Sequence, residues 1–145
     1  MKTSDQIRNV RQSSFGWMVQ RLARQLEEDM TARLSGIGIS IQQFAILMRV
    51  LEGDGLSQVE IGEIFAMPAY VISRALDGLE AKKMIARRPH PTSRRAHLIC
   101  PDQVGIALAA ELSKVVQEVN RELCAPLSPA ERAQFGELLQ KLVLG

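Results

Sequence analysis

The residues best suited to chemistry in this chain are basic side chains gathered between positions 66 and 100. Seven basic residues lie there against two acidic ones, Asp77 and Glu80, so this segment carries +5 while the whole chain has a formal charge of +2. Charge concentrated in one segment of a nearly neutral chain favours binding to a polyanion, with a solvated charged face as the alternative. The seven are Arg74, Lys82, Lys83, Arg87, Arg88, Arg94 and Arg95.

The apolar pattern around these residues predicts the elements that position them. Ser57 and Glu60 have the spacing of a capping box, in which each side chain satisfies a backbone N–H of the other residue, and this predicts the start of a short helix. Pro68 predicts the first position of a second helix, because proline is tolerated there. The residues expected to face inward are Val59, Ile61, Ile64 and Phe65 on the first helix and Val71, Ala75, Leu76 and Leu79 on the second.

After Met84 the apolar pattern changes from helical to partly alternating. Residues 85–88 and 96–100 predict two short antiparallel strands, joined by a turn at 90–93. A short helix, a turn and a second helix followed by such a hairpin form a winged helix-turn-helix, whose second helix fits a major groove. The pattern therefore predicts double-stranded DNA as the polyanion.

Groove chemistry predicts a role for individual side chains. Arg74 can donate two hydrogen bonds to guanine, and Ser73 can bond a base or a phosphate. Tyr70 suits the sugar-phosphate backbone or a thymine methyl, although packing is an equal alternative for Tyr70 and Ile72. Basic residues at the hairpin tip suit a narrow minor groove, and Lys82, Lys83, Arg87 and Arg88 suit phosphates. The residues expected to contact DNA are Ser57, Pro68, Ala69, Tyr70, Ser73, Arg74, Arg88, Arg94 and Arg95.

The flanking segments predict a mainly α fold with a small β-hairpin wing. An apolar stripe from Phe15 to Leu34 predicts a long helix that ends before Gly38, and a capping box at Ser40–Gln43 predicts a core helix. Two more helices are expected after Asp102 and Ser128. Ser128 and Glu131 have the spacing of a capping box, with Pro129 at the first helical position. The outer helices carry more apolar surface than one subunit needs, so a homodimer is expected. The residues expected to hold it include Met18, Leu22, Leu108, Leu112, Leu138 and Leu142.

Composition argues against several other classes of protein. No apolar run reaches 18 residues and the N-terminus lacks a signal sequence, so a soluble cytoplasmic protein is expected. The two cysteines are not spaced as a disulfide framework. His90 and His97 have no Cys, Asp or Glu at metal-ligand spacing, and no nucleophile, base and orienting group converge. No catalytic residue, metal or cofactor is therefore expected, and the protein is not expected to be an enzyme.

The run VISRALDGLEAKKMIARRPHPTSRRAHLICPDQVG and the order of the elements resemble the MarR family of transcription regulators. The resemblance implies one MarR-type domain over residues 1–145, with dimerisation helices at about 5–35 and 102–144 and a winged helix-turn-helix at about 40–100. The family has an aspartate where Ser93 stands in the wing and a glycine where Lys83 precedes it. Its helix-capping threonine corresponds to Asp102.

The resemblance also implies a function: a sequence-specific DNA-binding regulator, expected to be a repressor of a pseudo-palindromic operator. A small aromatic or apolar anion is the expected effector, and the residues expected near it are Phe15, Trp17, Phe44 and Arg49. One alternative is a regulator of the same fold that senses redox state through a thiol, Cys100 or Cys124. Another is a winged-helix module that binds protein, against which the clustered charge argues.

Overall fold

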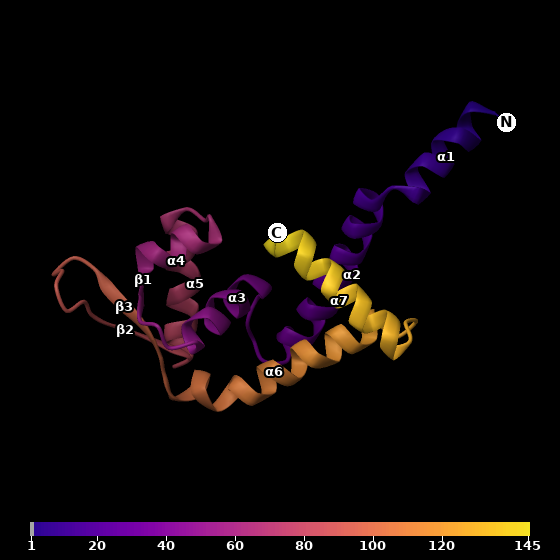
Figure 1. The fold of residues 1–145 in the computed structure, drawn as a ribbon. Helices are drawn as coiled ribbons and strands as arrows, with labels where there is room; N and C mark the ends of the chain where they lie inside the picture. Colours follow the sequence, from indigo (N-terminus) through magenta and orange to yellow (C-terminus); the bar gives the residue numbers. More distant parts are fainter. Residues whose placement is uncertain (1) are drawn as a thin grey trace. The chain divides into compact units, whose positions relative to one another are not determined.

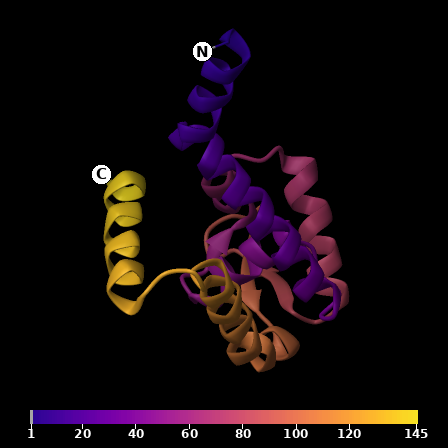
Figure 2. The ribbon, with the colours of Figure 1, turned by 90° about the vertical axis from the view of Figure 1, so that its right-hand side faces the viewer.

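The computed structural model describes residues 2–145. The chain divides into two compact units, one formed by the residues up to Asp29 together with Val115–Gly145, the other by Met30–Lys114. Figures 1 and 2 show the ribbon from two directions. The structure is mainly helical with a small antiparallel sheet, as the sequence predicted. Among the described helices, none combines the length and the hydrophobicity that crossing a membrane requires.

The unit Met30–Lys114 contains the predicted helix-turn-helix and hairpin. Its complete helices are α3 (Ile41–Leu51), α4 (Gln58–Phe65) and α5 (Ala69–Ala81). Its strands are β1 (Leu56–Ser57), β2 (Ile85–Pro89) and β3 (His97–Pro101), in the order β1-β3-β2. Leu56 pairs with Ile99, and Ile85 pairs with Pro101 at the other edge of β3. The predicted hairpin is therefore part of a three-stranded sheet, because a two-residue β1 is too short to show alternation in the sequence.

The core of this unit joins α3, α4, α5 and the sheet. Ile61, Leu76 and Leu79 are fully buried, as the sequence predicted. The prediction was wrong for Val59 and Ile64, which are 69% and 49% exposed, because the short α4 buries only the face centred on Ile61. The other fully buried large side chains of the unit are Leu34, Ile46, Leu47, Ile72, Ile85, Ile99 and Leu112.

Local hydrogen bonds begin most of the helices where the sequence placed them. Both reciprocal bonds of the Ser40–Gln43 capping box form, at 3.0 Å each. The second predicted box is half formed: the Ser57 hydroxyl accepts from the Glu60 N–H at 3.1 Å, but the Glu60 side chain gives no reciprocal bond. Pro68 is the residue before α5 rather than its first helical residue.

The other unit consists of α1 (Thr3–Ser13), α7 (Pro129–Leu144) and parts of α2 (Phe15–Ser35) and α6 (Gln103–Leu123). The chain leaves helical geometry at Ser14, whose hydroxyl accepts from the Trp17 N–H at 3.3 Å and so caps α2. The sequence did not predict this break. α7, yellow in Figure 2, begins with the predicted Ser128–Glu131 capping box. The two hydrogen bonds to Ser128 lower the pKa of Glu131 below its usual value.

The junction between α5, β2 and α6 is unusually close. Lys83 adopts a left-handed conformation with φ 59°, and the Met84 N–H then bonds the Leu79 carbonyl at 3.0 Å, which ends α5. The start of α6 packs on the same turn, because the Asp102 N–H donates to the Met84 carbonyl at 3.0 Å. A Cβ on Gly105 would lie 2.2 Å from that carbonyl oxygen, so only glycine fits this position without a shift of the backbone.

Lys83→Gly is expected to stabilise the fold by about 1 kcal/mol, because glycine adopts the left-handed region without the steric penalty of a side chain. Chemical denaturation followed by circular dichroism measures this difference. Lys83→Ala is the matched control, since it removes the charge and keeps the strained backbone, and it should change stability by less. Equal stabilisation by both substitutions would show that charge, not backbone conformation, is responsible.

Candidate nucleic-acid interface

The turn between α4 and α5 is held by backbone geometry. Ala66 adopts a left-handed conformation with φ 51° and ψ 44°, and the Met67 N–H bonds the Gly62 carbonyl at 3.1 Å. A Cβ on Gly62 would lie 3.5 Å from the Met67 carbonyl oxygen and 3.8 Å from the Ile72 side chain, so the space beside Gly62 is already bounded by the turn and α5. The direction in which α5 leaves α4 is therefore fixed within a few residues.

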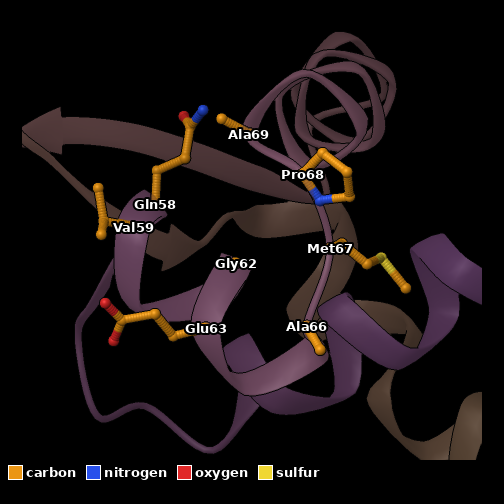
Figure 3. Close-up of a pocket in the computed structure, with 8 residues that line it drawn as sticks. All are labelled: Gln58, Val59, Gly62, Glu63, Ala66, Met67, Pro68 and Ala69. Atoms are coloured by element: carbon orange, nitrogen blue, oxygen red, sulfur yellow. The ribbon is translucent and has the colours of Figure 1, made fainter.

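A hollow of about 480 Å³ lies between α4 and the leading end of α5 (Figure 3). Figure 3 shows Gln58, Val59 and Glu63 on one side and Pro68 and Ala69 on the other. The lining is mostly apolar, which suits a thymine methyl group, and the Glu63 carboxylate can accept from a cytosine amino group. Pro68 and Ala69 are two of the residues that the sequence predicted to contact DNA, and that contact stays a prediction. The sequence missed Val59, whose place in the helical pattern resembled that of a core residue. The lining residues are Gln58, Val59, Gly62, Glu63, Ala66, Met67, Pro68 and Ala69.

The outer face of α5 carries the predicted base-reading residues. Tyr70 is 69% exposed, Arg74 is exposed, and Ser73 is half-buried. Tyr70 and Arg74 are four residues apart and so lie on the same face of the helix. No described carboxylate forms an ion pair with Arg74, so its guanidinium is available to a ligand. Ile72 is fully buried and belongs to the core, which decides between the two interpretations of that residue.

Ser57 is also close to the hollow but is placed differently from the other predicted residues. It is 8% exposed, and its hydroxyl oxygen already accepts the hydrogen bond that caps α4. The Ser57 hydroxyl can still donate one hydrogen bond to a phosphate oxygen. Its contact with DNA stays a prediction.

The wing carries three arginines that make no ion pair with a described carboxylate. They are Arg88 on β2 and Arg94 and Arg95 in the loop between β2 and β3, and all three are exposed. The pairing of Pro89 with His97 makes that loop residues 90–96. Inside it, the His90 Nδ1 accepts from the Thr92 N–H at 3.2 Å. With Ser93 at the position of the family's aspartate, neither loop arginine is held in one orientation by a described side chain.

Arg87 is bound to two carboxylates within the unit Met30–Lys114. Its side chain is only 14% exposed, and its guanidinium pairs with Asp77 at 2.8 Å and with Glu80 at 3.0 Å. Both carboxylates of the basic segment are bound to this one side chain, so the phosphate contact that the sequence suggested would compete with two ion pairs inside the unit. The Lys82 amino group donates to the Gly38 carbonyl. Long-range pairs of this kind leave no local pattern in a sequence.

The residues expected near an effector fall in both units. Phe15 is 83% exposed, and the Trp17 ring has the guanidinium carbons of Arg11 and Arg21 at 5.1 and 5.5 Å from its centre. In the other unit, Phe44 packs against the core. Arg49 there pairs with Glu52 at 2.9 Å and with Asp54 at 3.0 Å. An effector site near these residues stays a prediction.

Comparison with known proteins agrees with this geometry. The MarR family model matches residues 37–96, which span α3 to the wing. A regulator of the helix-turn-helix type from Bacillus subtilis, YxaD, is 31% identical over 98 residues, which cover 67% of this chain and 68% of that protein. The chain belongs to the MarR family.

Other members of the MarR family are similar over nearly the whole chain. The transcriptional repressor Rv2887 of Mycobacterium tuberculosis is 25% identical over 128 residues, or 88% of this chain and 92% of that protein. The structure of MarR from Escherichia coli superposes with a TM-score of 0.81 at 24% identity, covering 90% of this chain and 96% of MarR. Rv2887 in complex with DNA gives a TM-score of 0.80 at 24% identity, covering 90% and 98% of the two chains.

The related proteins are transcriptional regulators. Within residues 2–145, no three His, Cys, Asp or Glu side chains are grouped so that they could hold a metal ion. Cys100 and Cys124 are both free thiols, the first partly buried and the second buried. A thiol sensor of the same fold therefore stays a hypothesis.

The two arginine-bearing elements are expected to respond differently to substitution. Arg74→Ala removes a bidentate base contact and should weaken operator binding by about 1–3 kcal/mol, with relaxed preference at one position per half-site. Arg95→Ala should weaken binding more evenly across A·T-flanked sequences and reduce the salt slope by about one unit per wing. Competition binding at several salt concentrations separates the two effects. Unchanged affinity and preference in Arg74→Ala would contradict the assignment of α5 as the reading helix.

Proposed function

We propose that this protein is a DNA-binding transcriptional regulator that places α5 in the major groove and the β2–β3 wing in the adjacent minor groove. The observation that carries the proposal is the distribution of charge on the unit Met30–Lys114. Arg74, Arg88, Arg94 and Arg95 are exposed without ion pairs to described residues, whereas Asp77 and Glu80 both pair with Arg87, which leaves that group of three with one net negative charge. Such a surface attracts phosphate and presents arginine forks to the grooves.

Repression is the regulatory output that we propose. Rv2887, which is similar along most of the chain, is a transcriptional repressor, and a structure of it in complex with DNA has the same fold. A protein bound across a promoter represses by occupying the DNA that the polymerase needs, and it requires no further activity. The fold of this chain is compatible with that mode of action.

A homodimer is the proposed assembly, because unpartnered apolar side chains are abundant in one unit. Leu142, Val143 and Leu144 at the end of α7 are 82%, 77% and 81% exposed. Apolar surface of this kind usually marks an interface. Leu112 is different: it is fully buried in the core of the other unit, so it is removed from the residues proposed to hold the dimer. The other exposed apolar residues of the same unit are Ile7, Val10, Phe15, Met18, Val19, Leu22, Leu127, Leu138 and Leu139.

A small aromatic or apolar anion is the proposed effector. Trp17, with two guanidinium groups near its ring, provides an aromatic surface beside positive charge, and both features suit such an anion. Trp17 is the single tryptophan of the chain, so its fluorescence reports binding nearby. A panel of aromatic carboxylates that neither shifts this fluorescence nor releases bound operator would contradict the proposal.

Leu142→Glu is expected to shift the protein from dimer to monomer while leaving each subunit folded, since Leu142 is 82% exposed. A charge at the centre of an apolar interface costs several kcal/mol, which a dimer of ordinary stability cannot sustain at micromolar concentration. Sedimentation velocity measures the change. Leu112→Glu is the contrasting variant and should unfold the protein instead. A monodisperse monomer for the unmodified chain would refute the dimer.

The operator is expected to be a pseudo-palindrome whose half-sites lie about one helical turn apart, roughly 10 base pairs between centres. This spacing follows from the two-fold symmetry of the proposed dimer. Selection of bound sequences from a random DNA pool, followed by footprinting, tests the proposed function and the symmetry together. Failure to enrich any sequence would contradict a sequence-specific regulator, and a single unpaired short site would contradict the dimeric arrangement alone.

A further inference from the structure

Arg87 on β2 contacts both helices of the helix-turn-helix, α4 and α5, at once. Its Nη2 lies 2.8 Å from the Asp77 Oδ1 and donates to the Ser73 carbonyl at 3.3 Å, both on α5. Its Nη1 donates to the Glu80 Oε1 at 3.0 Å, near the end of the same helix. Its Nε donates to the Gln58 Oε1 at 3.5 Å, at the first residue of α4.

The main chain of Arg87 adds a second hydrogen bond to Glu80. Its N–H donates to the Glu80 Oε2 at 3.1 Å, so the two oxygens of one carboxylate receive the backbone and the side chain of one residue. A guanidinium has five N–H groups in a rigid plane, and here each of its three nitrogens has a partner within the unit. With the side chain 14% exposed, little of it remains for a phosphate.

We propose that Arg87 is a positioning residue, which couples the orientation of the wing to that of α5. Three of its four partners, Ser73, Asp77 and Glu80, lie along the helix that we propose to read the operator. The residue after Arg87, Arg88, is the first exposed residue of β2. Losing its guanidinium frees the hairpin to change its angle to α5. The contribution of the wing to DNA binding therefore depends on Arg87, although Arg87 does not touch DNA. This inference rests on the proposed function.

The neighbouring Arg88 provides a matched control on the same strand. Successive side chains of a strand point to opposite faces, and Arg88 is exposed with no ion pair to a described carboxylate. Loss of Arg88 removes one positive charge from the wing, as loss of Arg87 does. It removes no contact to α4 or α5, so it separates the effect of charge from the effect of position.

The experiment compares Arg87→Gln and Arg88→Gln, each alone and combined with the wing double substitution Arg94→Ala/Arg95→Ala, by operator affinity at fixed salt. Removal of the loop arginines is expected to weaken binding by about tenfold in the unmodified protein and in Arg88→Gln. In Arg87→Gln the same removal should weaken binding by less than about twofold, because the wing is no longer held at the groove. Equal, additive losses in both backgrounds would overturn the proposal.

A second measurement needs no DNA and tests directly whether Arg87 couples the wing to α5. Amide hydrogen exchange of the free protein should accelerate in β2 and β3 of Arg87→Gln, while Arg88→Gln should exchange like the unmodified chain. If the unmodified protein selects no operator, the proposed function fails and this measurement still decides the coupling. Unchanged exchange in Arg87→Gln would overturn it. If that variant does not fold, Arg87→Lys takes its place in both measurements, since lysine keeps the charge and loses the planar fork.

Discussion

The buried face of α5 is the constraint on which the DNA-binding surface depends. Ile72, Leu76 and Leu79 are fully buried, and they fix the rotation of α5 about its own axis. A helix turns about 100° per residue, so a shift of one position would expose a leucine and bury Arg74. Burying an unpaired guanidinium costs far more than any contact with DNA could return. The apolar face therefore determines that Tyr70 and Arg74 point outward, even though neither takes part in the core.

The two ends of α5 are set by backbone conformations that its residues do not favour. Ala66 before the helix and Lys83 after it both have positive φ, at 51° and 59°. Each costs on the order of 1 kcal/mol relative to glycine, and the surrounding core stabilises the turns enough to offset it. Gly105 completes the second turn, because a side chain there would collide with Met84. The position of α5 thus depends on its buried face, on the left-handed turn at each of its ends, and on the close approach of Gly105 to the second turn.

The sequence predicted the features that local chemistry decides. The capping boxes at Ser40 and Ser128, the long helix α6 and the exposed arginines of the wing follow from spacing within a few residues, and the structure contains them. Features that depend on distant partners escaped prediction. β1 exists only because β3 pairs with it, and Arg87 lies seven residues from Glu80 and ten from Asp77, with no periodic signal to join them. Burial of Leu112 likewise depends on residues that are distant in the sequence, because Leu112 belongs to the same core cluster as residues of α3, α4 and α5.

The same long-range pairs explain why a segment with two acidic residues can still meet a polyanion. A carboxylate beside the reading face of α5 would repel phosphate, and Asp77 is one turn beyond Arg74. Because Arg87 pairs with both Asp77 and Glu80, these two carboxylates keep one net negative charge between them, which the exposed arginines of the described part of this segment outweigh. One residue thereby halves the repulsive charge and fixes the strand that leads into the wing. A residue that only paired with the carboxylates, or only fixed the strand, would leave the other requirement unmet. The electrostatic and the geometric requirements of the surface are therefore met at the same position.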